Sequence, residues 1–218
     1  MDLAEAMRCA PTSRRFTAEP VSPDALRRAL DNARFAPSGG NRQGWRVVVV
    51  RDEGRRRAIR DLYLPAWRAY MERTGAAQML RSPDDFDAAR VRMLRRTDEY
   101  AEHLDEVPVH LVVGVRLGDL AVTDAQLPRQ SIVGGASVYP FVQNLLLGLR
   151  AEGLGAAMTT LLVPAEAEVK PLLGIPEDVA LAAHIGVGHR ADDWPKRLSR
   201  KPVEEFAFAE RFGEPLRD

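Results

Sequence analysis

The sequence predicts a single layered domain of the α/β or α+β class. Short apolar segments typical of buried strands alternate along the chain with longer segments of helical periodicity, the pattern of a sheet covered by helices. The chain has 218 residues, of which 45% are hydrophobic. That is enough for one substantial core and too little for two comfortable domains. Several helical connections are too long for a plain doubly wound repeat.

The first quarter of the chain predicts two helices and a buried strand. A short helix is expected at Leu3–Cys9. Ser22 and Pro23 are typical of a helix start, with serine as the N-cap and proline at the first helical position, and this helix ends before Pro37. The β-branched run Trp45–Val50 predicts a strand buried on both faces.

The middle of the chain is charged and weakly patterned. Helices are expected at 55–73 and 84–104, with a break at 74–77. The segment 63–104 is longer than a connection between two buried strands requires, so we interpret it either as a mobile helical lid or as a solvated pair of helices. Its aromatic and thioether side chains suit stacking over a planar ligand, or simply packing against the body. They are Tyr63, Trp67, Tyr70 and Met71.

The second half predicts three more strands and two more helices. Strands are expected at 109–115, 157–162 and 180–187, and a short helix at 164–173. A long helix at 131–152 is apolar over most of its circumference, which predicts burial against a partner subunit as well as its own sheet. Its polar residues Gln143 and Asn144 indicate either a contact that fixes the helix register or a ligand contact, and we favour the structural role. The tail from Arg197 onward lacks an apolar face of its own.

Composition and charge exclude several classes. Basic and acidic residues number 31 each, so no global field attracts nucleic acid or a membrane. The single cysteine, Cys9, allows no internal disulfide and is expected to be a packed apolar residue. The N-terminus carries two acids and no apolar stretch, so we expect no signal peptide and a cytoplasmic location.

Other site patterns are missing from the sequence. It has no glycine-rich dinucleotide or P-loop pattern and no serine nucleophile elbow. The four histidines lack metal-ligand spacing. Of these, His110 and His184 fall in expected strands and are interpreted as hydrogen-bonded core residues.

Three polar segments are candidates for ligand binding, each with a plain structural alternative. The string A-P-S-G-G-N-R-Q-G-W at 36–45 allows close backbone approach to a planar ligand, or forms a helix-to-strand turn. The segment T-S-R-R-F at 12–16 suits phosphate because arginine binds its oxygens bidentately, or is a solvated basic loop. The same alternatives apply to S-R-K-P at 199–202.

Together and in this order, the segments resemble the nitroreductase family. That family has an R-x-S-x-R-type segment, then A-P-S-x-x-N-x-Q-x-W, then a Q-N-L-L-L helix leading to G-L-G, and finally a basic S-R-x-P segment. This chain departs at three points: Ala10 or Pro11 replaces the first arginine, Leu198 a basic residue, and Gly44 a common proline.

The resemblance implies a fold, a cofactor and an assembly. The fold would be an α+β sandwich with a mostly antiparallel central sheet flanked by helices, forming a single domain with a helical lid at about 63–104. The C-terminal tail would be exchanged across a homodimer. FMN would bind at the dimer interface and pass electrons from NADH or NADPH to nitro, quinone or enone acceptors in a ping-pong cycle.

The resemblance also implies the residues of the site. The FMN phosphate would be held by Arg14 and Arg200 with Thr12, and Arg15 and Arg197 are possible substitutes for the missing basic residues. The isoalloxazine ring would be lined by Pro37, Ser38, Gly39 and Asn41, with Gln43 beside them. Backbone N–H groups would come from Met158, Thr159 and Thr160. No catalytic side chain and no metal are implied.

Three alternatives stay open at this point. The chain resembles a specialised dehalogenase or flavin-destructase type as well as a general reductase. It is also compatible with a non-catalytic flavin-binding or storage protein of the same fold, and with a deazaflavin in place of FMN.

Overall fold

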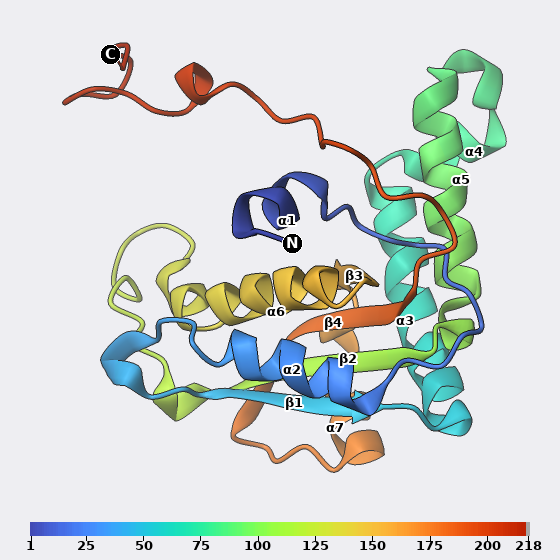
Figure 1. Ribbon diagram of the computed structural model, residues 1–218, viewed down its shortest axis with the longest axis horizontal. Helices are drawn as coiled ribbons and strands as arrows, with labels where there is room; N and C mark the ends of the chain where they lie inside the picture. The colour runs from blue at the N-terminus through green and yellow to red at the C-terminus, as the bar shows by residue number, and fades with distance from the viewer. Residues whose placement is uncertain (217–218) are drawn as a thin grey trace.

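A computed structural model describes residues 1–216, and its strands form one antiparallel sheet in the order β1-β2-β4-β3 (Figure 1). The strands are β1 (Trp45–Val50), β2 (Val109–Arg116), β3 (Leu154–Thr159) and β4 (Val179–His189). The helices are α1 (Leu3–Cys9), α2 (Pro23–Ala33), α3 (Glu53–Arg73), α4 (Ala76–Arg81), α5 (Ala88–Glu102), α6 (Tyr139–Ala151) and α7 (Glu166–Leu173). The prediction of an α+β fold with an antiparallel sheet and flanking helices is therefore confirmed.

Helices cover both faces of the sheet, because successive strand residues point to opposite faces. On one face, Leu111 and Ile185 pack against α2 and α6, where the rings of Trp45 and Phe141 stack with centroids 4.9 Å apart. On the other face, Val112 packs against α3, α5 and α7. The strands β2 and β4 are buried on both faces. The same expectation was wrong for β1, which lies at the edge of the sheet and exposes Val49 by 41%.

The long helix begins later than predicted. The α-helix starts at Tyr139 instead of 131, and residues 133–137 form a 3₁₀ helix. The reason is local: Asp124 accepts hydrogen bonds from the Ser131 hydroxyl at 2.7 Å and from the Ile132 N–H at 2.9 Å, which hold these residues in a loop. The predicted stop is confirmed, since Gly153 has φ of 77°.

The third strand is also shifted from its prediction. It spans Leu154–Thr159 instead of 157–162, since pairing begins with Leu154 opposite His189. It ends where the Thr159 hydroxyl accepts a hydrogen bond from the Leu161 N–H at 3.1 Å, a turn that competes with strand pairing. A second, smaller correction concerns Ser22, which precedes α2 but makes no capping hydrogen bond with its side chain.

The segment 63–104 contributes more to the core than its pattern indicates. Tyr63, Trp67 and Met71 of α3 are each at most 4% exposed, and Tyr100 and Leu104 are also buried. Of the two interpretations of these side chains, packing against the body is therefore the one observed for Tyr63, Trp67 and Met71, which fasten α3 to the sheet. Only α4 and the adjoining start of α5 project from the body (Figure 1).

The C-terminal tail leaves the body after β4 (Figure 1). One backbone hydrogen bond joins it to α1, from the Leu198 N–H to the Arg8 carbonyl at 2.8 Å. Beyond this point its apolar side chains are exposed, with Phe206 at 64% and Phe212 at 93%. Among residues 1–216, no helix is long and apolar enough to cross a membrane.

Candidate functional site

The N-terminal segment 12–17 runs along the outer edge of β3 and past the end of β4. The Ser13 N–H donates to the Ala156 carbonyl at 2.8 Å, and the Thr17 N–H donates to the His189 carbonyl at 2.9 Å. The Ser13 side chain is fully buried and its hydroxyl accepts a hydrogen bond from Arg190 at 3.1 Å. These contacts fix Arg14 and Arg15 at the edge of the sheet.

Gly155 makes this close approach possible. A Cβ atom at position 155 would lie 2.8 Å from the Ser13 Oγ atom and 2.9 Å from its Cβ atom. No ordinary side chain fits at that separation. Gly155, the second residue of β3, is therefore a packing requirement of the N-terminal segment.

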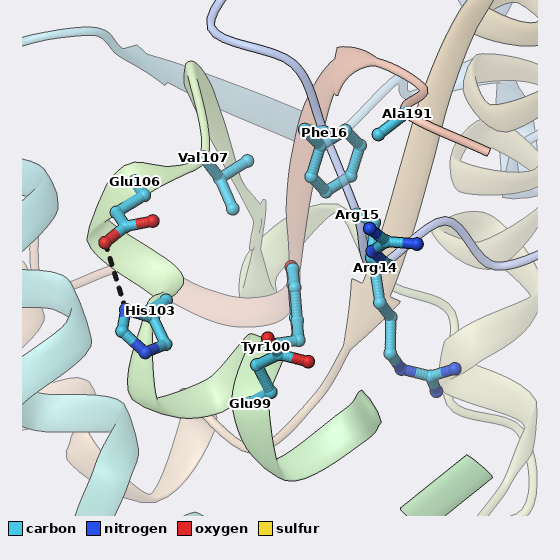
Figure 2. Close-up of a pocket in the computed structure, with 9 residues that line it drawn as sticks. All are labelled: Arg14, Arg15, Phe16, Glu99, Tyr100, His103, Glu106, Val107 and Ala191. Carbon is cyan, nitrogen blue, oxygen red and sulfur yellow. Dashed lines mark hydrogen bonds and ion pairs between the residues drawn. The ribbon is translucent and has the colours of Figure 1, made fainter. Parts of the chain in front are cut away.

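A cavity of about 270 Å³ opens between the N-terminal segment and α5 (Figure 2). The Arg14 side chain extends past Tyr100, while the opposite wall carries His103 and Glu106, whose Nδ1 and Oε1 atoms are 3.0 Å apart. Burial raises the pKa of the Tyr100 phenol, and its hydroxyl has no hydrogen-bond partner among the described residues. The cavity is thus mixed in charge and lined on one side by a neutral phenol.

A second hollow of about 280 Å³ adjoins it on the other side of Arg14. It is lined by Pro11, Thr12, Arg14, Arg15, Ala89, Arg92, Met93, Arg96, Arg190 and Asp192. Its single carboxylate, Asp192, is paired with Arg15 at 2.7 Å and lies 3.9 Å from Arg190. Five arginines against one aspartate make this hollow strongly electropositive.

The end of β3 offers unpaired backbone groups next to these hollows. The Ala156 carbonyl points away from β4, toward Ser13. Because backbone groups alternate in direction along a strand, the Met158 N–H points to the same outer edge. The Met158 side chain is 40% exposed, and Thr160 lies just beyond the strand. This edge can donate hydrogen bonds to a flat, polar ligand.

Hydrogen bonds within the loop at 37–44 and to Ser137 stabilise its conformation. The Ser38 hydroxyl accepts from the Gln43 N–H at 3.0 Å, and the Gln43 side-chain amide donates to the Asn41 side chain at 3.2 Å. The Gly39 N–H donates to the Ser137 hydroxyl at 3.0 Å. Asn41 and Gln43 both have positive φ, 53° and 51°. This conformation is uncommon outside glycine and is typical of functional loops.

Comparison with known proteins identifies the family. The model of the nitroreductase family matches residues 11–189. The chain belongs to the nitroreductase family. It is 30% identical over 203 residues to the NADH dehydrogenase of Thermus thermophilus, covering 89% of each chain. It is 30% identical over 212 residues to the 5,6-dimethylbenzimidazole synthase of Rhodospirillum rubrum, covering 92% of this chain and 82% of that protein.

The fold agrees with solved structures of nitroreductase relatives. An iodotyrosine deiodinase bound to FMN and 3-iodo-L-tyrosine superposes with a TM-score of 0.68 at 25% identity, covering 95% of this chain and 100% of that one. The four-stranded antiparallel sheet with its flanking helices is therefore a nitroreductase fold, and this chain is an enzyme of an oxidoreductase family.

One nitroreductase chain brings together only part of the expected site. Thr12, Arg14 and Arg15 lie beside the edge of β3. The loop at 37–44 leads into Trp45, which pairs with Val115 and so lies level with Ala180 near the start of β4. Phe16 of the N-terminal segment instead pairs with Arg190, just beyond the end of β4. Ten residues of β4 separate these two positions, about 30 Å along the strand direction. Thr159 at the end of β3 is closer, since it pairs with His184, but β1 and β3 are the two outer strands of the sheet.

The basic residues of the tail are also apart from the N-terminal pair. Arg200 is exposed, and its guanidinium donates to the Ser199 carbonyl at 2.7 Å. Arg197 is likewise exposed, and neither arginine lines the two hollows around Arg14.

The structure adds residues to the candidate site that the sequence did not single out. Arg92 and Arg96 face the hollow only because α5 crosses the N-terminal segment, and no short-range pattern shows that. The interpretation of His184 as a hydrogen-bonded core residue was wrong: it is fully buried, but neither ring nitrogen has a partner among residues 1–216. His110 matches the expectation in part, with Nε2 2.9 Å from the Leu104 carbonyl.

Proposed function

We propose that this chain is an FMN-dependent oxidoreductase that passes electrons from NADH or NADPH to nitro, quinone or enone acceptors in a ping-pong cycle. The match of the nitroreductase family to residues 11–189 carries this proposal. The relatives add to it, because one is named NADH dehydrogenase and a similar structure is bound to FMN.

The residues around β3 suit FMN in two respects. Thr12, Arg14 and Arg15 line an electropositive hollow that fits a phosphate, whose oxygens arginine binds bidentately. Met158 presents a backbone N–H at a free strand edge, where Thr159 and Thr160 continue the surface. A flat ring with polar edges can hydrogen-bond there without displacing any protein contact.

A second copy of the chain would complete the site. Pro37, Ser38, Gly39, Asn41 and Gln43 would then reach the flavin from the partner subunit, since in their own chain they precede β1, at the opposite edge of the sheet from β3. Exposed apolar side chains near this loop suit such an interface, with Phe35 and Ile132 each 70% exposed. The tail would extend onto the partner, covering Phe206 and Phe212 and bringing Arg197 and Arg200 to a flavin phosphate.

The protein's contribution to the chemistry is position and charge. Bound FMN would supply the hydride acceptor and donor. Arg14 would place a fixed positive charge beside the ligand, the β3 edge would orient the ring, and the projecting α4 and α5 would limit which acceptors enter. In this scheme no side-chain acid or base is needed for reduction by the nicotinamide.

A specialised reaction is a second candidate. The similarity to a 5,6-dimethylbenzimidazole synthase and to an iodotyrosine deiodinase structure favours a member whose second substrate is selected by the segment 63–104. Dehalogenation or flavin cleavage would use the same cofactor site. A storage protein of the same fold would bind flavin without turnover.

The purified protein tests these proposals directly. We expect flavin absorbance, release of FMN on denaturation, and oxidation of NADH or NADPH that depends on a quinone or nitro acceptor. Flavin without nicotinamide oxidation would indicate a storage protein. The absorbance spectrum of a deazaflavin would identify that cofactor in place of FMN. Absence of any flavin after reconstitution would contradict the proposal.

A further inference from the structure

Two arginines of α5 face the same hollow as the N-terminal segment. Arg92 and Arg96 are four residues apart and therefore lie on one side of the helix. Both line the hollow with Thr12 and Arg14. Arg90 and Arg95 of the same helix do not line it.

The positive charge in this hollow is not neutralised by the protein. Arg14, Arg92 and Arg96 form no ion pair among residues 1–216, while Asp192 is already paired with Arg15. Like charges four residues apart destabilise a helix, and Arg14 adds a third charge across the hollow. An arrangement of this kind is stabilised when a multiply charged anion binds between the arginines.

The basic groups reach this hollow from two directions. Ala10 and Pro11, which precede Thr12, carry no charge. The N-terminal segment contributes Arg14 and Arg15, and α5 contributes Arg92 and Arg96. An anion in the hollow would therefore have cations on both sides.

We propose that Arg92 and Arg96 complete, with Thr12 and Arg14, a binding site for a phosphate monoester. The inference rests on the proposed function, because the ligands that carry such a group are FMN itself or the 2′-phosphate of NADPH. In both cases α5 contacts the ligand's phosphate directly, so that ligand binding and the position of the projecting helices are coupled.

The test compares two variants with the same loss of charge on the same helix. Arg92→Gln/Arg96→Gln removes the proposed contacts, and Arg90→Gln/Arg95→Gln is the control. Fluorescence titration of the flavin-free protein gives the Kd for FMN and for riboflavin, which lacks the phosphate. Steady-state kinetics gives KM for NADPH and for NADH. Circular dichroism and thermal melting check that both variants fold.

The expected result is a phosphate-specific loss of affinity in the first variant alone. Each charge-assisted contact is expected to change affinity on the order of ten- to a hundred-fold. A loss for FMN but not for riboflavin assigns the site to the flavin phosphate. A loss for NADPH but not for NADH assigns it to the cosubstrate. Equal losses with and without phosphate, no loss, or the same loss in the control would overturn the proposal.

A direct probe separates this inference from the proposed function. Inorganic pyrophosphate carries the same kind of charge, and its binding to the protein is measured by calorimetry. If the wild-type protein binds no flavin, the proposed function fails, yet pyrophosphate binding that is lost only in Arg92→Gln/Arg96→Gln still supports the anion site. If pyrophosphate binds equally to both variants, the site is wrong even where FMN binds.

Discussion

The imidazole rings of His110 and His184 lie edge to face in the core, with centroids 4.9 Å apart and neither side chain exposed. Burial lowers the pKa of His110 to about 4, and lowers the pKa of His184 well below its usual value. Both rings are therefore neutral at pH 7. Protonating either one in the folded protein would place a charge between α3, α5 and the sheet.

This pair predicts a loss of stability in mild acid. In the unfolded chain both histidines bind a proton near pH 6.5, before they do so in the folded state. The free energy of unfolding is then fully retained above about pH 6.5 and falls as the pH drops toward 4, by up to about 2.7 kcal/mol per pH unit for two protons. Urea unfolding between pH 7.5 and 5 measures the slope. The control His103→Gln changes an exposed histidine and should keep the same slope. A free energy of unfolding that does not change with pH would contradict the prediction.

Replacing His184 by leucine should not destabilise the protein at pH 7. Neither of its nitrogens has a hydrogen-bond partner in the described part of the chain, and an unpaired buried polar group costs about 1–3 kcal/mol. His184→Leu is therefore expected to unfold at an equal or higher urea concentration and to halve the acid slope. His110→Leu is the contrast, because it leaves the Leu104 carbonyl without its donor. A clear loss of stability in His184→Leu would mean that an ordered water bridges its nitrogens.

Adding one methyl group at Gly155 should loosen the N-terminal segment. The new Cβ atom would meet the Ser13 side chain at less than 3 Å, and overpacking of this kind costs about 1–3 kcal/mol. We expect Gly155→Ala to expose the N–H groups of Ser13 and Thr17 to hydrogen exchange and to weaken FMN binding. Gly118→Ala serves as the control, since a Cβ there has open space. Unchanged exchange in Gly155→Ala would show that the segment adapts.

Removing the positive charge of Arg14 or Arg200 should weaken FMN binding without unfolding the protein. Loss of a charge-assisted phosphate contact is expected to cost about 1.5–3 kcal/mol, roughly ten- to a hundred-fold in affinity. Titration of Arg14→Ala and Arg200→Ala with FMN measures the change. Arg27→Ala, on the exposed side of α2, is the matched control. Full flavin occupancy in both variants would place the phosphate elsewhere.

Shortening the tail tests the dimer. A chain that ends at Lys201 loses Phe206 and Phe212, and the exposure of these two side chains indicates a surface that a partner subunit covers. We expect light scattering to give a dimer for the full chain and a monomer or aggregate for the shortened one. Phe206→Ser/Phe212→Ser should weaken the dimer while keeping the chain length. A folded full-length monomer at micromolar concentration would reject the proposed assembly.

Strong local patterns predicted the strands β1 and β2 better than they predicted the strand β3. The β-branched runs of β1 and β2 leave little choice of structure, so their bounds were predicted to within one residue. The strand β3, with the sequence L-G-A-A-M-T, has no such pattern, and its register depends on pairing with β4. Contacts between α5 and the N-terminal segment join residues about eighty positions apart, which local periodicity does not encode.

The position of β4 inside the sheet sets the order in which this chain can fold. This strand lies between β2 and β3 but is the last of the four in sequence. While the chain is being synthesised, β1 and β2 can pair early, yet the other edge of β2 stays open until residues 179–189 leave the ribosome. The N-terminal segment cannot complete its contacts any earlier, because Thr17 donates a hydrogen bond to His189 and Arg15 accepts one from Ala191. Its arginines thus reach their places only after nearly nine tenths of the chain exists.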